Sequence, residues 1–286
     1  MATTAQEVYP DKEPSTSTSD KKENEQKQPP DQSDIASEPW HELDVSEWNE
    51  KGVERLLKEV EDYTPIKRND IPSEKIPNVN FLLMGRISSG KSSFVNTVDS
   101  VLKGRLSIRS RAGCSGSSLT KSFNQSTPIT KDSIKFRKDP NMADRVHCVL
   151  FVIDGSNPPE ITMSQNVEKQ IKEFQEMMNR KKIPQLILLT KMDILSTIKG
   201  DVSKLIRSKS VEEMREKVAM SLGLPPYTVL PMQNIANSRT VSTDLKILTL
   251  YNLCQALHAA DDYLENFEDE IMADTYKGAQ VKSNRD

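Results

Sequence analysis

Apolar residues along this chain change their spacing several times, and each change marks an expected element. Between residues 46 and 63 large apolar side chains recur at helical spacing, which predicts a helix packed on a core. A proline-containing stretch follows at 69–77. Residues 79–84 then form a short apolar run typical of a buried strand, and a helical pattern begins near Lys91.

Apolar runs and helical patterns continue to alternate toward the C-terminus. The later expected strands are 146–153, 185–189 and 228–232, and the expected helices are 164–180, a segment from a capping box at Ser210 to Gly223, and 243–266. Strands that read as unbroken apolar runs are buried on both faces. The pattern therefore predicts an α/β fold of three layers, with a mostly parallel sheet and helices on both faces.

Composition separates the two ends of the chain from its centre. Residues 1–37 are rich in Pro, Ser, Thr, Gln, Glu and Lys, and they nearly lack large apolar groups. Such a segment cannot offset the entropy cost of ordering, so a disordered tail is expected. The expected order is then a helical extension and linker at 38–76, a folded domain at 77–267 and a polar tail at 268–286.

Charge and cysteine content exclude several classes of protein. The formal charge of −3 across 286 residues argues against a general nucleic-acid or anionic-membrane binder, which needs a clustered basic face. Three cysteines with no C-x-x-C spacing favour a reducing compartment. The N-terminus is polar, and no apolar run is long enough to span a bilayer. A cytoplasmic protein without a transmembrane segment is expected.

Residues 85–92 read Gly-Arg-Ile-Ser-Ser-Gly-Lys-Ser and fit the phosphate-binding pattern G-x-x-x-x-G-K-S/T. The motif lies between an expected strand and an expected helix, which favours a phosphate loop over an ordinary Gly/Ser turn. Backbone N–H groups and the helix N-terminus would hold phosphate oxygens, Lys91 would reach the β- and γ-phosphates, and Ser92 would bind Mg²⁺. The candidate nucleotide-binding residues here are Gly85, Arg86, Ile87, Ser88, Ser89, Gly90, Lys91, Ser92 and Ser93.

Thr190-Lys191-Met192-Asp193 directly follows the apolar run 185–189 and matches the guanine-binding pattern N/T-K-x-D. The Asp193 carboxylate would accept hydrogen bonds from guanine N1–H and the 2-amino group, a donor pair that adenine lacks. The Lys191 stem would cover one face of the base. Thr190 stands where asparagine is commoner and keeps a hydroxyl that can tie loops together. GTP or GDP with Mg²⁺ is the expected ligand of the 77–267 domain.

These residues and those around them resemble the interferon-induced protein 44 family over roughly residues 38–267. The stretches that carry the resemblance are 79–85, 90–94, 144–149, 151–152 and 259–264. The resemblance implies a P-loop, GTPase-like fold and a cytoplasmic GTP-binding protein of the innate antiviral immune response.

One part of the GTPase pattern is missing. Thr120 is the best candidate for the switch threonine that adds a second Mg²⁺ ligand. No D-x-x-G occurs in 105–145, and the family has several dozen more residues here, so the chain looks internally shortened. The sheet is then expected to lack the strand usually next to the P-loop strand. GTP hydrolysis is expected to be weak or absent, and no catalytic residue is assigned.

The preferred interpretation is a guanine-nucleotide-binding regulatory protein that acts by binding rather than by turnover. A slow active GTPase, a nucleotide-free interaction protein produced by truncation, and an ATP-dependent P-loop kinase are the alternatives. A homo- or hetero-oligomer with related G proteins also stays open.

Overall fold

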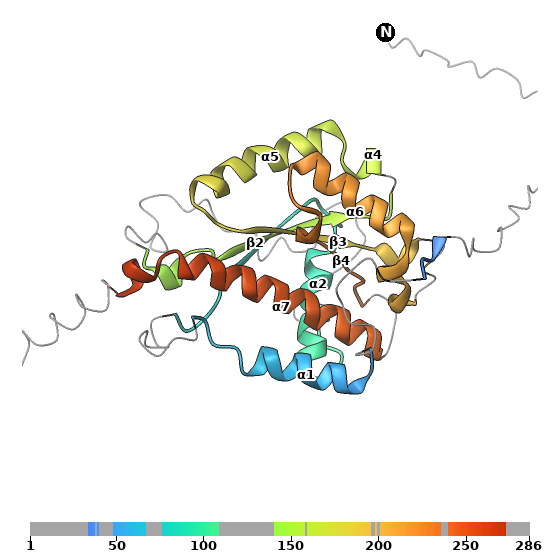
Figure 1. Cartoon of the computed structure of the whole chain (residues 1–286), viewed down its shortest axis with the longest axis horizontal. Helices are drawn as coiled ribbons and strands as arrows, with labels where there is room; N and C mark the ends of the chain where they lie inside the picture. Colours follow the sequence, from blue (N-terminus) through green and yellow to red (C-terminus); the bar gives the residue numbers. More distant parts are fainter. Residues whose placement is uncertain are drawn as a thin grey trace, which may run out of the picture. The chain divides into compact units, whose positions relative to one another are not determined.

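Four parallel strands, in the order β1-β2-β3-β4, form the centre of the fold (Figure 1). Their bounds are Phe81–Met84 for β1, Cys148–Asp154 for β2, Gln185–Thr190 for β3 and Val229–Pro231 for β4. The computed structural model describes residues 34–37, 39, 48–66, 76–108, 140–157, 159–195, 198, 201–235 and 240–272. The α/β class and the parallel sheet predicted from the sequence are confirmed.

Helices pack on both faces of this sheet. The α-helices are α1 Glu50–Glu61, α2 Lys91–Leu102, α4 Pro159–Thr162, α5 Gln165–Arg180, α6 Lys209–Leu222 and α7 Thr243–Glu265. The 3-10 helices are η3 Met142–Asp144, η4 Met192–Ile194, η5 Val202–Arg207 and η6 Pro226–Thr228. Figure 1 shows α5 and α6 on one face and α2, α7 and α1 on the other, with α7 in contact with α1, α2 and β2.

The two central strands form the most buried part of the core. Every residue of β3 is buried, and β2 is buried from Cys148 to Ile153. All four residues of β1 are only partly buried, and β1 pairs with β2 alone. Within the described residues, β1 is therefore an edge strand. The expected lack of a further strand concerns a segment that lies mostly outside the described residues, and it stays a prediction.

The helix ends follow local capping chemistry, with one departure from the sequence pattern. Ser208, rather than Ser210, caps α6: its backbone is extended and its side chain accepts a hydrogen bond from the N–H of Val211. The expected cap at Ser210 is wrong because Ser210 already lies inside the first turn, where its N–H and hydroxyl donate to Asp34. Gly223 ends α6 in the left-handed conformation, as expected.

The start of β1 is fastened to the segment that leads into β2. Buried His147 accepts a hydrogen bond at Nδ1 from the Asn80 N–H (3.1 Å), and its Nε2 lies 2.9 Å from the Met142 carbonyl. The Asn80 amide donates to the carbonyls of Ala143 and Arg145. These contacts hold the residues before β2 in register with those before β1.

Two observations bear on the remaining expectations. No described helix is long and apolar enough to cross a membrane. Residues 34–37, within the range assigned from composition to the N-terminal tail, contact the junction of η5 and α6, where the Ala36 N–H donates to the Arg207 carbonyl (2.9 Å). The domain boundaries stay predictions.

Candidate nucleotide-binding site

The phosphate loop joins the end of β1 to the start of α2, as the motif requires. Gly85 lies so close to β2 that a Cβ atom would sit 2.2 Å from the Val152 carbonyl oxygen, so no other residue fits without a backbone shift. Gly90, with φ of 100°, occupies the left-handed region directly before α2. The two glycines therefore fix a tight turn whose backbone leads straight into a helix N-terminus.

Lys91 folds back over this loop. Its Nζ donates hydrogen bonds to the carbonyls of Gly85 (2.7 Å) and Arg86 (2.6 Å), and burial lowers the pKa of its ammonium group. An ammonium group has three donors, so two hold the loop and the third can reach an anion within it. Arg86, Ile87 and Ser88 are exposed, whereas Ser89 is buried.

The expected Mg²⁺ ligands are only partly placed by the structure. Ser92 and its neighbour Ser93 lie in the first turn of α2, directly after the loop. Thr120 lies outside the described residues. Across the described ranges, no group of three or more His, Cys, Asp or Glu side chains could hold a metal ion.

The expected base-binding segment begins at the last residue of β3, beside the phosphate loop. The buried Thr190 hydroxyl donates to the Ser89 carbonyl (2.6 Å), so the predicted tie between the two loops is present. Lys191 has φ of 61° and forms an ion pair with Asp154. Asp193 is partly buried, and burial raises the pKa of its carboxyl group although the Lys191 charge opposes this.

Asp154 and Asn234 are two site residues to which the sequence interpretation gave no role. Burial alone would raise the pKa of Asp154, but hydrogen bonds from Lys191 and Ser156 hold it below its ordinary value. Asn234, just after β4, donates from Nδ2 to the Gly90 carbonyl (3.4 Å), while its buried Oδ1 has no hydrogen-bond partner among the described residues. Both residues lie at or just after the carboxyl ends of apolar strands, a position that could have marked them.

The structure thus brings residues 85–93 and 190–193 together at one edge of the sheet. The Gly155 N–H also bonds to the Thr190 carbonyl (2.9 Å), so the ends of β2 and β3 meet there. The nucleotide contacts of these residues stay predictions.

Comparison with known proteins confirms the resemblance seen in the sequence. Human interferon-induced protein 44-like is 28% identical over an alignment of 264 residues that covers 74% of this chain and 57% of that protein. Mouse interferon-induced protein 44 is 25% identical over an alignment of 261 residues that covers 74% of this chain and 60% of that protein. The human interferon-induced protein 44 is 24% identical over 76% of this chain. No protein-family model matches the chain.

The matches cover a smaller share of the relatives than of this chain. The chain spans less than two thirds of the length of these relatives, between 57% and 60%. In the match to the human 44-like protein, 74% of 286 residues is about 212 residues, against an alignment of 264. About 52 positions of that alignment therefore have no residue of this chain opposite them. The shortening expected within 105–145 stays a prediction.

Proposed function

We propose that this chain binds guanine nucleotide with Mg²⁺ and acts as an interferon-induced regulatory protein through the bound state rather than through hydrolysis. The observation that carries the proposal is the 2.6 Å hydrogen bond from Thr190 to the Ser89 carbonyl, which joins the candidate base segment to the phosphate loop. A single nucleotide must reach both segments at once, and this bond sets their relative position.

The phosphate end of the site suits a polyphosphate. Gly85 permits the close approach of the loop to β2, and α2 directs its N-terminal N–H groups and its positive dipole end toward the loop. Lys91 adds a charge-assisted hydrogen bond. The residues also fit Mg²⁺, which keeps several waters and binds phosphates with few protein ligands. When bound, the ion would neutralise phosphate charge, and Ser92 would hold it.

The base end of the site favours guanine. The Asp193 carboxylate is partly buried, and this burial raises the pKa of its carboxyl group because it removes part of the hydration. Guanine N1–H and the 2-amino group would supply two donors to this carboxylate. Adenine would leave it unsatisfied, which is a strong basis for rejection.

Hydrolysis has less support. The described sheet places β1 at its edge, and the sequence has no D-x-x-G to hold the Mg²⁺ water shell and sense the γ-phosphate. We therefore infer that GTP and GDP both bind and that turnover stays at background level.

Titration calorimetry with GTP, GDP, ATP and the xanthine nucleotide XTP, each with Mg²⁺, tests the proposal. Asp193→Asn should weaken GTP binding by about 100-fold or more and should allow XTP to bind, since an amide can donate to the xanthine 2-carbonyl. Asp262→Asn, an exposed aspartate on α7, is the matched control and should leave both affinities unchanged. Lys91→Ala should weaken all nucleotides by about 10- to 100-fold.

Three results would each replace the proposal with an alternative. No GTP binding at millimolar concentration would leave a nucleotide-free interaction protein. Steady phosphate release that Lys91→Ala abolishes would indicate a slow GTPase. An unchanged GTP to ATP preference in Asp193→Asn would indicate an ATP-binding P-loop protein such as a kinase.

A further inference from the structure

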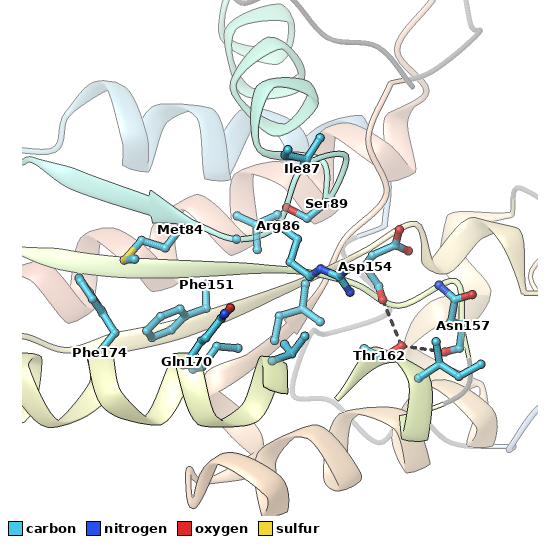
Figure 2. A pocket seen from close by; sticks show the side chains of 16 residues that line it. Met84, Arg86, Ile87, Ser89, Phe151, Asp154, Asn157, Thr162, Gln170 and Phe174 are labelled. Atoms are coloured by element: carbon cyan, nitrogen blue, oxygen red, sulfur yellow. Dashed lines mark hydrogen bonds between the residues drawn. The ribbon is translucent and has the colours of Figure 1, made fainter. Parts of the chain in front are cut away.

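A cavity of about 310 Å³ opens beside the phosphate loop. Its floor is formed by β1 and β2, its opposite wall by α4 and α5, and one end by the loop itself (Figure 2). Thr190, Lys191 and Asp193 do not line it. The cavity is therefore distinct from the place proposed for the guanine base.

Most of the cavity wall is apolar. Met84 of β1, Phe151 of β2 and Ile171 and Phe174 of α5 face the space. The rings of Phe151 and Phe174 meet edge to face, with centroids 6.1 Å apart, which holds the two aromatic side chains in place. An apolar body of matching size would displace water from this surface at a gain in free energy.

The end of the cavity near the phosphate loop is polar and carries an uncompensated positive charge. Figure 2 shows Arg86 extending from the loop across the cavity in a different direction from Ile87. Arg86 has no acidic partner within the described part of the chain, whereas the Asp154 carboxylate is already paired with Lys191 and Ser156. Asn157 and exposed Gln170 add amide groups to the lining, with Gln170 beside Phe151 and Phe174 (Figure 2).

We propose that this cavity binds a small amphipathic anion, a carboxylate with an apolar body. The body lies against Phe151 and Phe174, and the carboxylate is held by Arg86, whose planar guanidinium matches carboxylate geometry. With a water occupying about 30 Å³, the volume corresponds to a ligand of about ten non-hydrogen atoms. The site does not require guanine nucleotide to bind.

Three probes with the same eight-carbon length but different charge separate the contribution of charge to binding from that of apolar contact. Octanoate, octanol and octylamine are added to nucleotide-free protein, and binding is measured by saturation-transfer NMR and calorimetry. Octanoate should bind about tenfold more tightly than octanol, because a charge-assisted hydrogen bond adds to the same apolar contact. Octylamine should bind more weakly than octanol, since its ammonium group meets the charge of Arg86.

Variants at two exposed positions locate the binding. Arg86→Gln should remove the tenfold preference for octanoate while changing octanol binding less than about twofold. Gln170→Glu should weaken octanoate selectively by placing a like charge in the cavity lining. Arg180→Gln removes the same charge at the far end of α5, does not line the cavity and should have no effect.

The inference is overturned if the three probes bind equally, if none binds at millimolar concentration, or if Arg180→Gln weakens octanoate as much as Arg86→Gln does. Circular dichroism of each variant verifies that the fold is intact. Because the probes are tested without nucleotide, a negative result here is separate from failure to bind GTP.

Discussion

Thr190 shows how one side chain can serve both the fold and the proposed site. It is completely buried, and its hydroxyl lies between the Ser89 carbonyl at 2.6 Å and the Ile153 carbonyl at 3.1 Å. The pattern N/T-K-x-D identified the position, and the preserved hydroxyl predicted a contact between loops. The sequence could not identify Asn234 as a neighbour of Gly90, because that contact depends on where β4 ends relative to α2.

Replacing Thr190 with valine keeps the side-chain shape and removes the hydroxyl. The buried Ser89 carbonyl then loses its donor, so the free energy of unfolding should fall by about 1–2 kcal/mol. GTP affinity should fall as well, since the two loops are no longer joined. Urea unfolding and calorimetry measure the two effects. Thr190→Ser keeps the hydroxyl and is the control; an equal loss of GTP affinity in both variants would contradict this role.

At the scale of elements, the expected order of strands and helices is present, but their ends and cross-links depend on tertiary contacts. The runs at 146–153 and 185–189 correspond to buried β2 and β3, because unbroken apolar sequence suits strands covered on both faces. The cap of α6 is Ser208 rather than Ser210, and both serines donate hydrogen bonds to Asp34, which is distant in the sequence. Periodicity carries no information about such a long-range contact.

His147, at the junction of β1 and β2, should make stability depend on pH. Burial lowers the pKa of its imidazole below the ordinary value of about 6.5, so protonation favours the unfolded chain. The contribution of His147 to the free energy of unfolding is complete above about pH 6.5. At lower pH this contribution decreases, by at most about 1.4 kcal/mol per pH unit. Urea unfolding from pH 7.5 to 5.5 should give a steeper decline for the native chain than for His147→Gln. Parallel declines would show that His147 does not cause the loss.

At the scale of the whole molecule, the phosphate loop and the expected base-binding segment at 190–193 lie at one edge of the sheet. Within the described residues, β1 has a single strand neighbour. Relatives of this chain are longer, and about 52 aligned positions of the human 44-like protein have no counterpart here. The proposed nucleotide contacts therefore lie in residues that this chain has, whereas the expected D-x-x-G segment does not occur in its sequence.

Inserting the relatives' additional segment should restore turnover without being needed for GDP binding. GTP hydrolysis should rise by about 100-fold, since the segment would supply groups that stabilise the reacting phosphate. GDP affinity should change less than about threefold, because the contacts of Lys91 and Asp193 are already present. Phosphate release and calorimetry measure the two quantities. Unchanged hydrolysis in a folded, GTP-binding insertion variant would contradict this division.

The conformation of Lys91 has a kinetic consequence. Its two hydrogen bonds to the Gly85 and Arg86 carbonyls hold the loop in shape before any nucleotide arrives. Association should then be a single fast phase whose observed rate rises linearly with GTP concentration, without the plateau that a slow loop rearrangement produces. Stopped-flow fluorescence with a labelled GTP measures this rate. In this protein, no slow closure of the loop would then limit the rate at which a nucleotide binds.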